Sequence, residues 1–114
     1  MTDKLPNASR AYVEEKRITT YLLDLAHNDG KSKAKFFRNR GFAPDQWQVM
    51  EQALISQGQD NGVTRVIHNE WGTRYQVDCH CPTPDATNPC IRTVWQIALG
   101  ESCPRLLTAH PLPN

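Results

Sequence analysis

The chain has 114 residues, of which 39% are hydrophobic and 22% charged, and its formal net charge at pH 7 is +1. This length is typical of one domain with a modest core, and the charge excludes a protein whose whole surface is basic. The first residues, MTDKLPNAS, lack a secretory signal, and no apolar stretch is long enough to span a membrane. We therefore expect residues 1–114 to form one cytoplasmic domain, or a domain delivered into a target cell by another route, with no membrane association.

A first helix is predicted over residues 14–25, where apolar side chains recur at the spacing of one helical face. The residues with this spacing are Ile18, Tyr21, Leu22 and Leu25. Asn28, Asp29 and Gly30 follow, and this combination favours a turn that ends the helix.

Two further helices are predicted in the first half of the chain. Ser32 is suited to cap a short second helix, which Gly41 can end in the left-handed conformation. Pro44 suits the first turn of a third helix. We expect that helix to reach Ser56, because its apolar residues recur at helical spacing up to that point.

The second half of the chain is predicted to form four strands. Alternating and β-branched residues mark them over residues 63–69, 73–81, 90–98 and 104–110. Gly72 suits a tight turn between the first two strands, and the proline-rich loop CPTPDATNPC joins the second to the third. The predicted fold is α+β, with N-terminal helices packed on one face of a four-stranded antiparallel sheet.

Positive charge is concentrated between residues 31 and 40, which hold five of the thirteen Lys and Arg residues. On a helix, Lys35 and Arg38 fall on one side, with Lys31 just before it. These three residues form either a solvated face or a set of contacts to RNA phosphates. Lys33 differs, because it falls on the side that two phenylalanines must bury. A cation there must reach solvent or find an anion.

Lys33 also lies in the first turn of the predicted helix, where the helix dipole disfavours a cation. The unpaired backbone N–H groups of that turn, together with Lys31 and Lys33, would form a phosphate-binding site. His27 lies across the preceding turn, where an imidazole serves either as a proton carrier or as a simple contact to the helix end. The spacing alone does not separate these two roles.

Residues of the predicted strands are candidates for the same site. Arg92 lies in a strand with few other charges, and Thr108 alternates onto one face with His110. A sheet covered by helices needs only one apolar face, so we expect Arg92 and Thr108 to project on the open face or edge. The alternative for Arg92 is a surface arginine without a function.

Several segments together resemble one bacterial family: LPNASRAYV, RITTYLL, SKAKFF followed by GF, RTVW, and PRLLTAHP. The family is known as domain of unknown function 6883, and the resemblance extends from Leu5 to Pro111, which leaves residues 112–114 as a tail. The family's motif residues correspond here to His27, Lys33, Arg92, Thr93, Trp95, Thr108 and Pro111. His110 departs from the pattern, which has a tyrosine at that place, and the cysteines are not part of it.

Members of this family are similar to small toxin-like domains, and the order of elements also resembles barnase, colicin and RelE-type ribonucleases. The resemblance implies a metal-independent endoribonuclease that needs no cofactor and cleaves RNA, tRNA being one candidate, by attack of a 2′-hydroxyl. A small cognate antitoxin or immunity protein would be its partner. In that reaction His27 is base or acid, Lys33 and Arg92 hold the phosphate, Thr108 donates a hydrogen bond and His110 is a second imidazole.

The alternative function is a non-catalytic binding module, either an adaptor or an inhibitor, whose basic helix grips an acidic protein or nucleic acid. A third reading is a nuclease fold that has lost its activity, for which the unusual His110 is the motive. The first two readings differ in whether His27, Lys33 and Arg92 share one cleft.

Cysteine usage leaves three alternatives for Cys79, Cys81, Cys90 and Cys103. The alternatives are that the cysteines are free thiols, that they form a structural zinc site, or that two of them form a disulfide across the proline-rich loop. The C-x-C spacing matches no common zinc motif, and strand alternation predicts that Cys79 and Cys81 share one face with His80 opposite. We favour free thiols and therefore expect no bound metal.

Overall fold

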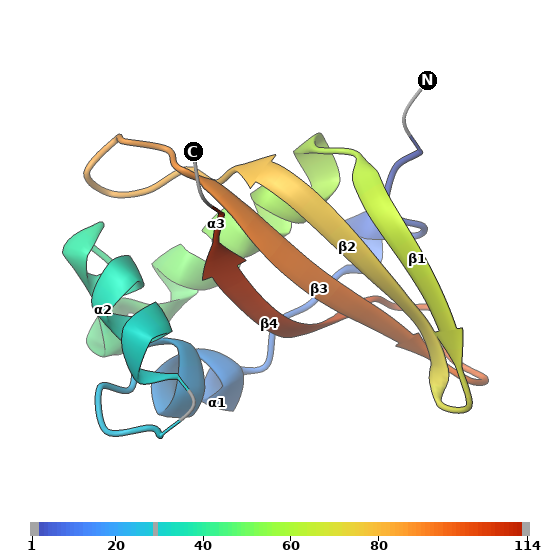
Figure 1. Ribbon diagram of the computed structural model, residues 1–114, viewed down its shortest axis with the longest axis horizontal. Coiled ribbons are helices and arrows are strands. Elements are labelled where there is room, and N and C mark those ends of the chain that lie inside the picture. The colour runs from blue at the N-terminus through green and yellow to red at the C-terminus, as the bar shows by residue number, and fades with distance from the viewer. Residues whose placement is uncertain (1–2, 29, 113–114) are drawn as a thin grey trace.

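The structure is a computed structural model that describes residues 3–28 and 30–112 (Figure 1). Its helical elements are η1 (Ala8–Arg10), α1 (Glu15–Arg17), η2 (Ile18–Leu22), α2 (Lys31–Asn39), η3 (Pro44–Gln46) and α3 (Trp47–Asp60). Its strands are β1 (Val63–Asn69), β2 (Gly72–His80), β3 (Cys90–Ala98) and β4 (Arg105–Pro111). The predicted α+β order, helices followed by four strands, is confirmed.

The strands form one antiparallel sheet in the order β1-β2-β3-β4, so β4 lies at an edge. Gly72 adopts a φ of 140° in the β1–β2 turn, and a Cβ there would lie 2.2 Å from the Ile97 carbonyl oxygen. Only glycine fits both constraints. The β3–β4 register shifts between Val94 and Trp95, so β4 carries one extra residue at this point.

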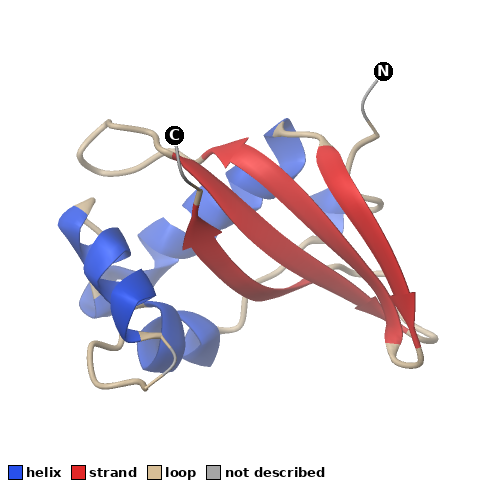
Figure 2. Cartoon of the chain, in the orientation of Figure 1, coloured by secondary structure: helices blue, strands red, loops and turns tan. Residues whose placement is uncertain are grey.

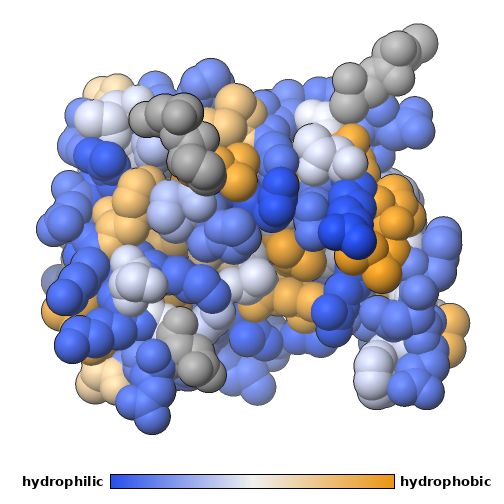
Figure 3. Space-filling view, viewed as in Figure 1, coloured by the Kyte–Doolittle hydropathy of each residue, from blue (hydrophilic) through white to orange (hydrophobic). Residues whose placement is uncertain are grey.

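Helical elements cover one face of the sheet and one of its edges (Figures 1 and 2). Helix α3 crosses behind β2 and β3, whereas α2 lies beside β4. The opposite face of the sheet is open, and this side of the molecule is mainly hydrophilic (Figure 3). The edge between α2 and β4 is where the N-terminal half of the chain meets the open face.

The core lies between α3 and the inner face of the sheet. Trp95 is fully buried, and Gly58 of α3 packs so close to its indole that a Cβ would lie 2.8 Å from the ring. The buried amide of Gln57 donates to the carbonyl oxygen of Val77 and accepts a 2.6 Å hydrogen bond from Thr93. The motif residues Thr93 and Trp95 are therefore core residues, since their polar atoms are satisfied inside the protein.

The predicted first helix is much shorter than expected. One α-helical turn, α1, passes directly into the π-helical turn η2, where the Leu23 N–H donates to the Ile18 carbonyl oxygen five residues before it. The Thr20 hydroxyl donates to the Lys16 carbonyl oxygen, a bond that competes with the regular helix. Leu25 consequently lies beyond the helix and is 42% exposed, so its predicted place on the buried face is wrong.

The second and third helices lie close to their predicted positions. Gly30 rather than Ser32 is the N-cap of α2, because the helix begins at Lys31, two residues earlier than the predicted cap allows. Gly41 follows α2 with a φ of 102°, as its predicted role requires. The turn η3 begins at Pro44 and leads into α3, which ends at Asp60, four residues beyond the predicted end.

Candidate active site

Three side chains from three elements meet where η2, α2 and β4 converge. The Lys33 ammonium of α2 donates hydrogen bonds to the Tyr21 hydroxyl of η2 and, at 3.2 Å, to the Thr108 hydroxyl of β4. The two hydroxyl oxygens are 3.0 Å apart and share a further hydrogen bond. We call these three residues the Tyr21 cluster. It is partly exposed, and 87 positions separate Tyr21 from Thr108 in the sequence.

Local backbone geometry places Tyr21 in this cluster. The π-helical turn adds a residue to the turn, which rotates the side chains that follow. Gly30 then packs directly on Tyr21, since a Cβ at Gly30 would lie 2.7 Å from the Tyr21 carbonyl oxygen and 2.9 Å from its ring. A π-helical turn is frequent at functional sites. Sequence periodicity assigned Tyr21 to the core face and so missed it.

Charge around Tyr21 favours its ionised form. Burial alone would raise the pKa of the Tyr21 hydroxyl, but hydrogen bonds from Lys33 and Thr108 outweigh it, and the charges of Lys33 and Arg17 add to them. The net result is a pKa below the ordinary value of 10.0. The Lys33 Nζ lies 4.9 Å and the Arg17 Cζ lies 5.7 Å from the centroid of the Tyr21 ring. The phenolate is thus stabilised by two cations.

A cleft of about 410 Å³ opens beside Tyr21. It is lined by Lys16, Arg17, Thr20, Tyr21 and His27. The Nε of Arg17 is buried and, within the described part of the chain, has no hydrogen-bond partner. A buried donor without a partner is costly. The positive charge of Arg17 at the wall of the cleft would attract an anion.

His27 lies at the wall of the cleft. Its ring stands edge-on to that of Tyr21 with 5.0 Å between centroids, and its Nδ1 accepts a 3.0 Å hydrogen bond from the backbone N–H of Gly30. Since a backbone N–H can only donate, a neutral His27 carries its proton on Nε2. His27 therefore stabilises the turn before α2 and also lines the cleft. Its position is compatible with both predicted roles, a proton carrier and a contact near the end of the preceding helix.

Lys33 does not sit between the two phenylalanines. Phe37 is buried and packs against Phe42, whereas the Lys33 ammonium points to the hydroxyl of Tyr21. The Lys33 ammonium does have partners, as expected, but they are two hydroxyl groups and the face of the Tyr21 ring rather than an anion. Two of the three ammonium N–H groups are used in this way, which leaves one for a ligand.

The three other basic residues predicted to contact RNA are on the surface of α2. Lys31, Lys35 and Arg38 are all exposed. The Arg38 side chain is partly committed to the fold, since its Nε donates a 2.7 Å hydrogen bond to the Leu23 carbonyl oxygen. Lys31 and Lys35 remain as solvated charges.

Arg92 has a partner of its own on the open face of the sheet. Its guanidinium makes two hydrogen bonds to the Asp78 carboxylate, at 2.9 and 3.0 Å. The bonds to Asp78 raise the pKa of Arg92. Its register partner on β4 is His110, whereas Thr108 lies opposite Val94. Arg92 therefore lies opposite a β4 residue two positions beyond Thr108, and the Asp78 carboxylate neutralises its charge.

His110 lies on β4 two residues beyond Thr108. Its Nδ1 lies 3.1 Å from the Pro111 carbonyl oxygen, which can only accept, so the Nδ1 of His110 carries a proton. A neutral His110 consequently presents its lone pair on Nε2. This imidazole belongs to the open face with Arg92 and is not one of the residues that line the cleft beside Tyr21.

Within the described residues the four cysteines are not gathered into one group of metal ligands, so the zinc alternative gains no support there. No group of three or more His, Cys, Asp or Glu side chains within residues 3–28 and 30–112 is placed to hold a metal ion. Cys81 is buried with its Sγ 3.7 Å from the Ala53 carbonyl oxygen. Cys79 instead contacts Cys90, because strand alternation ends at Cys79, whose φ is 126°. The prediction that Cys79 and Cys81 share a face depended on that alternation.

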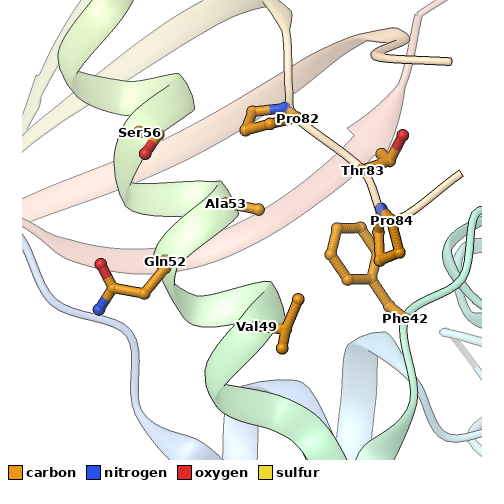
Figure 4. Close-up of a pocket in the computed structure, with 8 residues that line it drawn as sticks. All are labelled: Phe42, Val49, Gln52, Ala53, Ser56, Pro82, Thr83 and Pro84. Carbon is orange, nitrogen blue, oxygen red and sulfur yellow. The ribbon is translucent and has the colours of Figure 1, made fainter. Parts of the chain in front are cut away.

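A second hollow, about 330 Å³ in volume, lies between α3 and the proline-rich loop (Figure 4). Its lining consists of Phe42, Val49, Gln52, Ala53, Ser56, Pro82, Thr83 and Pro84. None of these side chains is ionisable in the ordinary pH range. The hollow has no acid or base to offer, so the cleft beside Tyr21 is the better candidate for chemistry.

Within the described residues, no helix is both long and apolar enough to cross a membrane. No curated protein and no solved structure matches the sequence. Residues 4–113 match a family described as "Domain of unknown function (DUF6883)". The match covers nearly the whole chain, and the protein belongs to this family.

Proposed function

We propose that this protein is a metal-independent endoribonuclease that cleaves RNA at the cleft beside Tyr21. The observation that carries the proposal is the Tyr21 cluster itself, in which an ammonium and two hydroxyls share hydrogen bonds beside a cleft lined by cationic side chains. Such a cluster combines a group that can take a proton with a cation for a phosphate. Cleavage of RNA by its own 2′-hydroxyl needs a base, a cation for the phosphate and an acid for the leaving oxygen, and one ammonium can serve as the last two.

In the proposed reaction the Tyr21 oxygen takes the proton of the 2′-hydroxyl. The bond between the 2′ oxygen and phosphorus forms, and the bond from phosphorus to the 5′ oxygen breaks. The Lys33 ammonium gives a proton to the departing 5′ oxygen and recovers one from Tyr21 through the hydrogen bond between them. The products are a 2′,3′-cyclic phosphate and a free 5′-hydroxyl, so all protons are accounted for.

The remaining residues of the cleft bind and position. Arg17 would bring its positive charge to a phosphate oxygen, and the ring of His27 would form part of the wall that positions the RNA. Thr108 orients the Tyr21 hydroxyl from the strand edge. This assignment transfers the proton-carrying role from His27 to Tyr21, and it leaves Arg92 outside the reaction because Asp78 neutralises it.

The resemblance to toxin-like domains supports a role in growth inhibition, with an acidic antitoxin or immunity protein as the partner that covers the cleft. The test is tightly controlled expression in a bacterium, followed by growth and total RNA integrity. Wild-type protein should arrest growth and fragment RNA, Lys33→Ala should do neither, and the exposed control Lys35→Ala should behave as wild type. If wild-type protein binds RNA without cleaving it, the binding-module alternative replaces this proposal.

A further inference from the structure

Two thiols meet at the base of the proline-rich loop. The Sγ atoms of Cys79, near the end of β2, and of Cys90, the first residue of β3, are 2.8 Å apart. Both residues are partly exposed and both are free thiols. A covalent S–S bond is about 2.05 Å long, so the two sulfur atoms need to approach by only about 0.8 Å to form one.

The backbone holds this arrangement at a cost. Cys79 has a φ of 126°, in the region that side chains rarely adopt. An outlier of this kind persists only where the surroundings enforce it, and such outliers cluster at functional positions. Here the outlier interrupts the strand alternation and turns the Cys79 thiol toward Cys90 rather than toward the position that alternation would give it. The strained residue is thus the one that creates the pair.

The two thiols are chemically unequal. Burial, then the hydrogen bond and charge of Cys79 and the charge of Asp78, raise the pKa of Cys90 to about 11. The Cys79 Sγ lies 3.7 Å from the Nδ1 of His80 and accepts a hydrogen bond from the Cys90 thiol. Cys79 is therefore the thiol that attacks and Cys90 the thiol that resolves. Once the Cys79 sulfur is in a mixed disulfide, it can no longer carry the negative charge that opposes ionisation of Cys90.

We propose that Cys79 and Cys90 form a reversible dithiol–disulfide pair, oxidised by thiol–disulfide exchange with a low-molecular-weight disulfide. The Cys79 sulfur attacks one sulfur of that disulfide, the bond between the two small-molecule sulfurs breaks, and the Cys79 proton leaves with the first released thiol. The Cys90 sulfur then attacks Cys79, its proton leaving with the second released thiol. The two protein thiols lose two electrons, and the small disulfide gains them.

The bond would close a ring through residues 80–89 beside a contact that already exists there, the 3.0 Å hydrogen bond from the Cys81 N–H to the Pro89 carbonyl oxygen. This contact already holds the two ends of the ring together. Pro82, Thr83 and Pro84 of this ring form one wall of the hollow in Figure 4, so oxidation would tie that wall to the sheet. This inference is independent of the proposed ribonuclease activity.

The test exposes the reduced full-length protein to oxidised glutathione and follows it by intact mass and peptide mapping. We expect a loss of two hydrogens, a Cys79–Cys90 cross-link, and a rise in Tm of roughly 5–15 °C that a reductant reverses. Cys90→Ser should stop at a glutathione adduct on Cys79. The matched control Cys103→Ser changes another partly exposed thiol and should still form the cross-link.

Cys81 provides an internal control, since burial raises the pKa of its thiol to about 12 and it should stay unmodified. The proposal is overturned if Cys79 and Cys90 both remain open to alkylation after oxidation. It is equally overturned if the cross-link found joins Cys103 or Cys81 instead, or if Cys90→Ser gains a disulfide elsewhere at the wild-type rate.

Discussion

Lys33 and Tyr21 contact each other in two ways: the ammonium donates a hydrogen bond to the phenol oxygen and also lies 4.9 Å from the ring centroid. Lys33 thus stabilises the Tyr21 phenolate and holds an ammonium proton next to the phenol oxygen. Because Thr108 bonds both groups, the pair is held in place from the edge of the sheet.

Replacing Lys33 by methionine keeps most of the side chain's length and removes only its charge and donors. The direct hydrogen bond between Tyr21 and Thr108 remains, so the free energy of unfolding should change by no more than about 1 kcal/mol. RNA cleavage should fall at least about 100-fold, because the phosphate and the leaving oxygen lose their cation. Denaturant unfolding and a cleavage assay measure the two effects, with Lys35→Met as the matched control. Loss of the fold with retained cleavage would make Lys33 structural.

The pH dependence of stability reports on Tyr21. Its pKa is lower in the folded protein than the ordinary 10.0 of an unfolded chain. The stabilisation from ionised Tyr21 is therefore absent below the folded-state pKa, grows as pH rises toward 10.0, and is constant above it. Wild-type protein should gain stability relative to Tyr21→Phe across this alkaline window, and the control variant Tyr12→Phe, which keeps Tyr21, should show the same gain. A difference that shrinks as pH rises would contradict the lowered pKa.

Gly58 should tolerate no side chain. A Cβ at this position would lie 2.8 Å from the Trp95 ring, and the ring cannot move because it is fully buried. Overpacking of this kind costs about 1–3 kcal/mol, of which the better helix propensity of alanine returns up to about 1. Gly58→Ala should therefore lower the free energy of unfolding by up to about 2 kcal/mol in denaturant titrations. Gln52→Ala, on the exposed side of α3, is the control, and equal stability of the two variants would refute the packing argument.

Arg92 is expected to matter for stability rather than for cleavage. Its side chain is 32% exposed and that of Asp78 is 19% exposed, so the ion pair should contribute only about 1 kcal/mol. Arg92→Ala should leave cleavage within about threefold of wild type, because the guanidinium is neutralised and lies outside the cleft. The kinetic assay for Lys33 serves here as well. A loss of cleavage as large as that of Lys33→Met would return Arg92 to the catalytic set.

Periodicity predicted the strands and the α+β order well, because alternation and turn residues are local signals. It failed where a local signal was overridden by tertiary contacts. Tyr21 and Leu25 both matched one helical face, but the π-helical turn ended that face after Leu22. The Tyr21 hydroxyl consequently contacts Lys33 and Thr108, which come from other parts of the chain. Its hydroxyl on an otherwise apolar face, four residues after Arg17, was the one sequence signal that pointed to it.

The sequence did identify Lys33, Thr108 and His27 as members of one region, and the structure places all three around Tyr21. It did not separate Arg92 from them, since an ion pair to Asp78 depends on the register of β2 with β3 rather than on local pattern. The direction of the Cys79 side chain could not be predicted for a related reason, because the backbone φ there is 126° and no local pattern indicates it.

The most direct test of the central claim is the chemistry of the RNA ends. Purified wild-type protein, treated with a chelator, should convert a short RNA into fragments with 2′,3′-cyclic phosphate and 5′-hydroxyl termini, as resolved by mass spectrometry. Tyr21→Phe should fold and bind that RNA yet cleave it at least about 100-fold more slowly, because only the proton acceptor is lost. Cleavage by Tyr21→Phe at the wild-type rate, or no cleavage by the wild type, would contradict the assignment of Tyr21 as the catalytic base.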